Sequence, residues 1–185
     1  QAVEMFPDLS MSFEVLSDDL AAMEREALKI AGWAENCHIK IPITNTQGQS
    51  TKDVIKSLSA QGVKLNVTVV FTPAQARVAV QALSPEVSSY ISVFAGRITD
   101  TGMDPLPIVR EVLQMIRQGP RPKTELLWAS TKELYNIVQA EQAGCSIITV
   151  GYDILDRLHV IGRSLEDSSL DMIKMFFEAT QASGL

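Results

Sequence analysis

Short runs rich in β-branched and aromatic residues alternate along the chain with longer segments of mixed polarity. Runs of this length and composition predict strands. We expect strands over Ser12–Leu16, His38–Ile43, Leu65–Phe71, Ser89–Phe94, Glu125–Ala129 and Ser146–Val150.

The segments between these runs carry apolar residues at helical spacing. Gly62 and Gly144 stand where two of these helices should end, and Thr72-Pro73 stands where a third should begin. Strands that alternate with helices are typical of right-handed βαβ units and a parallel sheet. The expected helices span about 18–34, 50–61, 73–83, 104–118, 131–143 and 152–159, with a terminal helix over about 168–182.

The chain of 185 residues has no Pro/Gly-rich hinge, so we expect one domain over 1–185 with six βα units between about 12 and 160. Six such units form either an open doubly wound sheet or most of an eight-stranded barrel. The open sheet usually has a Gly-rich phosphate loop after its first strand, which this sequence lacks. Polar residues recur instead in and after several strands, where barrel enzymes place their chemistry. This pattern favours an α/β barrel.

Residues i and i+2 of a strand share a face, so the polar residues of each strand can be assigned to one side. Leu65, Val67 and Val69 are expected on the opposite, apolar face of their strand, against helices. A sheet with one solvated face is the alternative. The pairs expected on the polar face are Asn66 with Thr68, Ser92 with Phe94, and Trp128 with Ser130.

Lys40 lies within the apolar run His38–Ile43, which is otherwise typical of a buried strand. Full burial disfavours the ammonium and lowers a lysine pKa by roughly 3–5 units, which yields an amine able to form a Schiff base with a carbonyl. A lysine on an edge strand, or one whose ammonium reaches water, is the alternative. Lys40 is therefore a candidate nucleophile.

Further polar groups occupy positions suited to chemistry. Glu14 is flanked by apolar residues in a strand; it exchanges protons near neutral pH if buried, and is otherwise a solvated strand residue. Arg97 directly follows a strand and suits either a phosphate or a surface ion pair. Ser130-Thr131-Lys132 is expected to begin a helix, where N–H groups favour an anion, or where Ser130 is simply the N-cap.

Composition and charge narrow the function classes. The chain is 46% hydrophobic and 21% charged, as globular proteins are, and its net charge of −6 argues against non-specific nucleic-acid binding. No apolar stretch approaches the roughly 20 residues of a membrane span, and no secretory signal is present. Cys37 and Cys145 are expected to be reduced thiols, and His38 and His159 lack metal-ligand partners. We expect a cytoplasmic protein without a metal, nucleic-acid or membrane partner.

Several of these stretches resemble the transaldolase family of Schiff-base aldolases, which includes small transaldolases and fructose-6-phosphate aldolases. The match is collinear from about Ser12 to Leu158. It rests on Ser12-Phe13-Glu14-Val15, Lys40-Ile41-Pro42-Ile43-Thr44, Asn66-Val67-Thr68-Val69-Val70-Phe71, Ala74-Gln75-Ala76, Ile91-Ser92-Val93-Phe94-Ala95-Gly96-Arg97-Ile98, Ala129-Ser130 and Ala143-Gly144-Cys145.

The resemblance implies a role for each candidate and no cofactor. The lysine that matches Lys40 forms an imine with a ketose phosphate, and the residues that match Glu14 and Thr68 position a water for proton transfer. Fructose-6-phosphate aldolases carry glutamine and tyrosine at or near the positions of Glu14 and Phe94, so dihydroxyacetone transfer between sugar phosphates is favoured over simple cleavage. The substrate-binding residues implied are Asn66, Ser92, Phe94, Arg97, Ser130 and Lys132.

The resemblance also implies a (β/α)8 TIM barrel of the class I aldolase type, with the first two βα units missing from this chain. Those units carry an aspartate and a Thr-Thr-Asn-Pro-Ser strand that this sequence lacks. A fructose-6-phosphate aldolase-like lyase, or a non-catalytic descendant that binds sugar phosphates or a protein partner, therefore stays an alternative. Short members assemble into rings, so an apolar face of the terminal helix meets either a neighbouring copy or its own barrel. That face contains Met172, Met175, Phe176 and Phe177.

Overall fold

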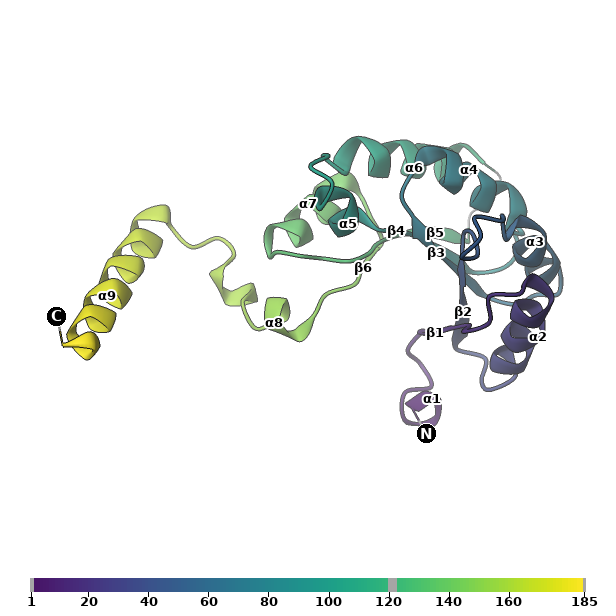
Figure 1. Ribbon diagram of the computed structural model, residues 1–185, viewed down its shortest axis with the longest axis horizontal. Helices are drawn as coiled ribbons and strands as arrows, with labels where there is room; N and C mark the ends of the chain where they lie inside the picture. Colours follow the sequence, from purple (N-terminus) through teal and green to yellow (C-terminus); the bar gives the residue numbers. More distant parts are fainter. Residues whose placement is uncertain (1, 120–122, 185) are drawn as a thin grey trace. The chain divides into compact units, whose positions relative to one another are not determined.

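A parallel sheet of six strands organises the first part of the chain. The computed structural model describes residues 2–119 and 123–184. Each strand pairs with the strand before it in sequence, so the order is β1-β2-β3-β4-β5-β6 (Figure 1). The strands are β1 (Met11–Glu14), β2 (Cys37–Pro42), β3 (Leu65–Val70), β4 (Ser89–Val93), β5 (Thr124–Trp128) and β6 (Ile147–Ile148).

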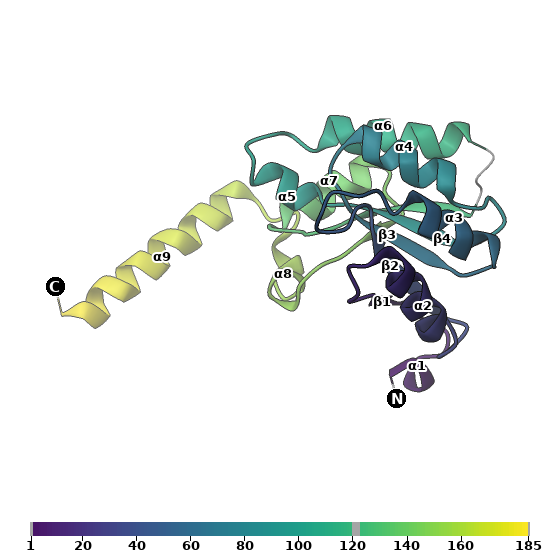
Figure 2. The same cartoon turned by 45° about the vertical axis from the view of Figure 1, so that its right-hand side comes forward.

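Helices connect the successive strands and lie on the convex side of the curled sheet (Figure 2). Neighbouring helices pack side by side, with α3 against α2 and α4, and α4 against α6. The alternation predicted from the sequence, and with it the α/β class and a partial βα barrel, is confirmed. The helices of this part are α1 (Ala2–Met5), α2 (Leu20–Ala31), α3 (Lys52–Ala60), α4 (Pro73–Ala82), α5 (Ala95–Thr99), α6 (Leu106–Gln118) and α7 (Tyr135–Ala143).

The hydrophobic core lies between the sheet and these helices. Ile39 and Ile41 of β2 and Leu65 and Val67 of β3 have no exposed surface, and they pack in one apolar cluster with side chains of the helices. Their alternation with polar neighbours is the one that the sequence predicts for a strand with one helix-covered face. Burial of this face, at about 25 cal/mol per Å² of apolar surface, stabilises the fold.

Local signals place several helix ends as expected. Thr72 accepts a hydrogen bond from the Gln75 backbone N–H, and the Gln75 side chain accepts one from the Thr72 N–H, which completes a capping box before Pro73. Gly144 ends α7 with φ +84°, a conformation that glycine adopts without steric cost.

The predicted alternation is wrong at Val69. The register between β3 and β4 shifts between Val67 and Val70, and Val69 adopts φ +61° with 36% of its surface exposed. Val69 is the extra residue of a β-bulge, so Val70 takes the buried position that alternation assigns to Val69.

The predicted alternation is also wrong for β5. Trp128 is fully buried in the core cluster, on the helix-covered side. Leu127 and Ala129 instead face the concave side. Ser130 reaches that side because its backbone turns at φ +63°, not because it shares a face with Trp128.

Element boundaries differ from prediction in several places, three of which follow β4 or β5. Helix α7 begins at Tyr135, so Ser130–Leu134 form a loop, and neither the predicted helix start nor the N-cap role of Ser130 is correct. Strand β6 is shorter than the predicted run and spans only Ile147–Ile148. Helix α5, Ala95–Thr99, is not predicted because five residues are too few to show a period.

Residues 151–185 form a second compact unit, distinct from residues 1–150. It contains α8 (Tyr152–Leu155), a 3₁₀ turn over Leu158–Val160 and α9 (Leu165–Ser183). Ser164 accepts a hydrogen bond from the Asp167 N–H and caps α9. The expected terminal helix is confirmed as α9. The expectation of one domain over 1–185 stays a prediction. So does the surface that the apolar face of α9 contacts. Apolar residues of α9 with exposed side chains include Ile173, Phe176 and Phe177.

Candidate functional site

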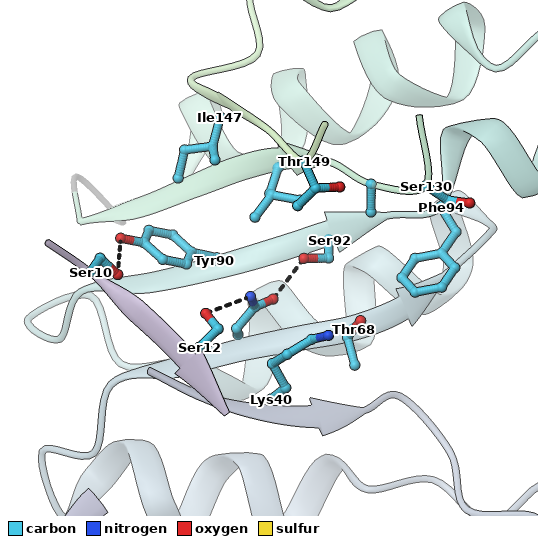
Figure 3. A pocket seen from close by; sticks show the side chains of 13 residues that line it. Ser10, Ser12, Lys40, Thr68, Tyr90, Ser92, Phe94, Ser130, Ile147 and Thr149 are labelled. Atoms are coloured by element: carbon cyan, nitrogen blue, oxygen red, sulfur yellow. Dashed lines mark hydrogen bonds between the residues drawn. The ribbon is translucent and has the colours of Figure 1, made fainter. Parts of the chain in front are cut away.

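The concave side of the sheet encloses an open cavity of about 780 Å³ (Figure 3). Every strand contributes to its wall, directly or through the residues that flank it. The residues that alternate with the lining residues along the same strands point into the core. One face of each strand therefore lines the cavity, and the other face packs in the core. The lining residues are Ser10, Ser12, Lys40, Asn66, Thr68, Tyr90, Ser92, Phe94, Leu127, Ala129, Ser130, Ile147 and Thr149.

Lys40 and Glu14 form an ion pair at the cavity. The parallel register places Glu14 of β1 opposite Lys40 of β2, and Lys40 Nζ lies 3.3 Å from Glu14 Oε2. Strand β2 pairs with strands on both sides, so Lys40 is not on an edge strand. Its side chain is 30% exposed and that of Glu14 is 46% exposed, so both groups are partly hydrated. The pair combines an amine with a group that can accept its proton.

The loops after β1 and β2 are joined beside this pair. Asp18 accepts hydrogen bonds from the Thr46 backbone N–H at 2.8 Å and from Thr46 Oγ1 at 2.7 Å. These bonds hold the pKa of the Asp18 carboxyl below its usual value. Asn45 stabilises the loop after β2, because its Oδ1 accepts hydrogen bonds from the backbone N–H groups of Gln47 and Gln49. The two strands that carry Glu14 and Lys40 are thereby tied together at their carboxyl ends.

Asn66 of β3 pairs with Lys40 of β2 in the register, and both polar atoms of its side-chain amide make hydrogen bonds. Its Nδ2 donates to Ser12 Oγ at 3.0 Å, and its Oδ1 accepts from Ser92 Oγ at 2.6 Å. Asn66 is only 3% exposed, so these bonds fix the orientation of the amide. A second Nδ2 hydrogen and the Ser12 hydroxyl hydrogen have no protein acceptor among these bonds and remain for a ligand.

Thr68 also lines the cavity, and its buried hydroxyl has no hydrogen-bond partner among the described residues. Thr68 is 1% exposed. A buried hydroxyl without a partner costs about 1–3 kcal/mol, and a bound water or substrate group would remove that cost. Phe94 adds an apolar wall to the cavity, and its ring centroid lies 5.9 Å from that of Phe71.

His38 and Tyr90 stack at the other end of the cavity wall. Their ring centroids are 4.2 Å apart with an interplanar angle of 12°. His38 Nδ1 lies 2.9 Å from Ser10 Oγ and Nε2 lies 3.2 Å from Ser88 Oγ. Burial, together with the charge of Lys64, lowers the pKa of His38 to about 4. His38 is therefore neutral at neutral pH, and its ring packs against Tyr90.

Two cations meet near the carboxyl ends of β4 and β5. Arg97 Nη1 lies 3.4 Å and Lys132 Nζ lies 3.3 Å from the same oxygen, Oδ2 of Asp100. Gly96 makes this convergence possible, because a Cβ atom there would lie 1.7 Å from the carbonyl oxygen of Ser130. Helix α5 and the Ser130 loop approach each other so closely that only glycine fits at position 96.

Comparisons with known proteins identify the family. The model of the Transaldolase/Fructose-6-phosphate aldolase family matches residues 1–185. The chain belongs to this family.

Individual relatives agree. A probable transaldolase of Caldicellulosiruptor saccharolyticus is 36% identical over 151 residues, which are 82% of this chain and 66% of that protein. A probable transaldolase of Nitrosopumilus maritimus is 31% identical over 80% of this chain and 63% of its own length. One of Methanococcus maripaludis, strain C7, is 32% identical over 93% of this chain and 75% of its own length. The chain thus spans just under two thirds of the first two relatives.

Family membership directs attention to the residues predicted from the sequence. The structure gathers Lys40, Asn66, Thr68, Ser92, Phe94 and Ser130 around one cavity, with Glu14 paired to Lys40. Arg97 and Lys132 each form a solvent-exposed ion pair with Asp100, which brings the two cations close together. Their functional roles stay predictions.

Sequence reasoning missed several contributors to the site, and four of them show which signals were available. Ser12 was recognisable because it lies two residues before Glu14 on the same strand face, and Tyr90 because it lies two residues before Ser92. Asp100 follows Arg97 at helical i,i+3 spacing, which is also a sequence signal. Gly96 was not recognisable, because its close contact with Ser130 joins segments far apart in sequence.

Other expectations concern metals, membranes and cysteines. In residues 2–119 and 123–184, no three His, Cys, Asp or Glu side chains gather as metal ligands. None of the helices in those ranges has the length and apolar character to cross a bilayer. Cys37 and Cys145 are free thiols, as expected, and burial raises the pKa of Cys145 to about 11.

The low pKa of His38 predicts an acid-sensitive stability. The unfolded histidine binds a proton near its ordinary pKa of about 6.5, whereas the folded one does so only near 4. The contribution of His38 to stability is therefore complete above about 6.5 and is lost as the pH falls toward 4, by at most about 1.4 kcal/mol per pH unit. In urea unfolding, His38→Gln should lose less free energy of unfolding between pH 7 and pH 5 than the wild type. An identical loss in both proteins contradicts this interpretation.

The contact of Gly96 with Ser130 predicts a sharp steric effect. Gly96→Ala places a methyl group against backbone, so we expect a loss of about 1–3 kcal/mol in the free energy of unfolding. Gly32→Ala is the matched control, because a Cβ there lies 3.5 Å from its nearest neighbour and φ is −75°. Urea unfolding should separate the two variants. Equal stabilities would show that the Ser130 loop yields without cost.

Proposed function

We propose that this protein transfers a dihydroxyacetone unit between sugar phosphates through a Schiff base on Lys40. The observation that carries the proposal is the Lys40–Glu14 pair at the wall of the cavity. Lys40 is the one lysine or arginine side chain in the described lining of that cavity. Membership of the family and the names of the relatives support a reaction of this kind.

The chemistry begins when Glu14 accepts a proton from the Lys40 ammonium, 3.3 Å away. The free amine adds to the ketone carbon of the donor, and loss of water leaves the imine. The C–C bond between the α and β carbons of the imine then breaks while the β-hydroxyl group gives its proton to the water held by Glu14 and Thr68. This releases an aldehyde, and the electron pair of the broken bond stays in an enamine on Lys40. Addition of that enamine to an acceptor aldehyde forms the new C–C bond, and water then releases the product from the lysine.

The remaining side chains suit the other parts of a sugar phosphate. The Ser12–Asn66–Ser92 bonds leave donors and acceptors directed at hydroxyl groups of a substrate. The unpartnered Thr68 hydroxyl would hold a water for proton transfer with Glu14, a role supported by its lack of a partner in the protein. Arg97, Lys132 and Ser130 would bind the phosphate, and Phe94 would pack against the sugar chain.

We further propose that the curled sheet belongs to a TIM barrel of the class I aldolase type that contains two more βα units than this sequence. The supporting observations are the parallel order β1 to β6, the concave face lined by polar groups, and the greater length of the relatives. Eight parallel strands close a barrel, whereas six do not without distortion.

Borohydride reduction tests the role of Lys40. In the presence of fructose 6-phosphate, the wild type should gain the mass of a reduced dihydroxyacetone adduct, and peptide mapping should place it on Lys40. Lys40→Arg keeps the charge beside Glu14 but cannot form an imine, so it should gain none. Lys64→Arg is the control, because Lys64 bonds the Glu35 carbonyl outside the cavity lining and its loss should leave labelling unchanged. Absence of the adduct, under conditions that label a known transaldolase, contradicts the proposal.

A lyase on the same scaffold is the second candidate, since the family description names fructose-6-phosphate aldolase as well. Dependence on an acceptor separates the two. A transferase should consume fructose 6-phosphate only when an aldose phosphate acceptor is present, and Glu14→Gln, which removes the carboxylate, should lower that rate by about a hundredfold or more. Consumption without an acceptor, measured by release of free dihydroxyacetone, would establish the lyase instead.

A further inference from the structure

Asp100 joins the two cations near Ser130. One carboxylate oxygen, Oδ2, lies 3.4 Å from Arg97 Nη1 and 3.3 Å from Lys132 Nζ, so it pairs with both cations. Arg97 belongs to α5 and Lys132 to the loop before α7, so this oxygen links two separate segments. Two like charges this close repel each other, and a shared anion removes that repulsion.

This bridge is accessible to solvent and easily opened. The side chains of Arg97, Lys132 and Asp100 are 58%, 39% and 47% exposed. Ion pairs with this exposure contribute little to stability. Only one Arg97 nitrogen bonds Asp100, so other guanidinium N–H groups stay available for an oxyanion.

A phosphate group is a stronger partner for these cations than Asp100. A phosphomonoester carries close to two negative charges above its second pKa of about 6, and it offers three acceptor oxygens. A carboxylate carries one charge. These cations therefore attract a phosphate group more strongly than they attract the Asp100 carboxylate.

We propose that Asp100 is an internal counter-ion of the phosphate site, which the phosphate of a substrate displaces when it binds. The inference rests on the proposed sugar-phosphate function. While the site is empty, Asp100 holds Arg97 and Lys132 together. When phosphate arrives, the same carboxylate competes with it, so Asp100 lowers the affinity of the site for phosphate and helps product to leave.

Removal of the Asp100 charge tests this role. With inorganic phosphate above its second pKa, calorimetric titration of the full chain should give about fivefold tighter binding to Asp100→Asn than to the wild type at low salt. The gain should shrink as salt rises, because ions screen exposed charges. Asp100→Glu keeps the charge and should bind like the wild type. Asp53→Asn removes one exposed carboxylate elsewhere, on α3, and should change the affinity less than twofold.

Unchanged or weaker phosphate binding by Asp100→Asn overturns the proposal, and so does an equal gain in Asp53→Asn. Absence of phosphate binding to the wild type overturns it as well. Borohydride trapping with dihydroxyacetone, which has no phosphate, reports on Lys40 separately. If dihydroxyacetone is trapped on Lys40 but Asp100→Asn does not bind phosphate more tightly than the wild type, only the role of Asp100 is refuted. If no dihydroxyacetone is trapped but Asp100→Asn binds phosphate more tightly than the wild type, the Schiff-base function is refuted and the role of Asp100 stands.

Discussion

The register of the parallel strands is the constraint on which the rest of the site depends. Glu14, Lys40 and Asn66 occupy one row across β1, β2 and β3, because each strand pairs in phase with the next. Since alternate residues face opposite sides, a slip of one residue would send all three side chains into the helix-covered core. The apolar residues between them prevent that slip. Burial of Ile39, Ile41 and Val67 thus fixes the position of the polar groups without touching them.

Much of this arrangement is predictable because it is local. The period-two pattern of β2 predicts its inner and outer faces, and the helix signals at Thr72 and Gly144 predict where α4 begins and α7 ends. The pairing of Glu14 with Lys40 requires only that adjacent strands be parallel and in phase. Where strands are regular and their neighbours in sequence are neighbours in space, the sequence is enough to predict which residues meet.

The pattern fails where the backbone departs from regular geometry. The bulge at Val69 adds a residue without a change in composition, so no period reveals it. At β5, Trp128 is an aromatic residue that fits either face of a strand, and only the space beneath the helices decides for burial. The convergence of Arg97 and Lys132 depends on the packing of Gly96 against Ser130, a contact between distant segments. Such contacts are set by the tertiary fold and not by local sequence.

These departures gather at the carboxyl ends of the strands. Val69 and Ser130 are the non-glycine residues with positive φ in the described chain, and they end or follow β3 and β5. Thr68, beside Val69, keeps a buried hydroxyl without a partner, and Arg97, Asp100 and Lys132 surround the loop of Ser130. Each strained residue costs about 1–3 kcal/mol, and so does the orphan hydroxyl. At the amino end of β5, Thr124 also keeps a buried hydroxyl without a partner. His38 and Tyr90, near the amino ends of β2 and β4, instead stack with hydrogen-bonded polar atoms. Backbone strain is thus found at the carboxyl ends of the strands in the described residues, whereas unpartnered buried hydroxyls occur at both ends.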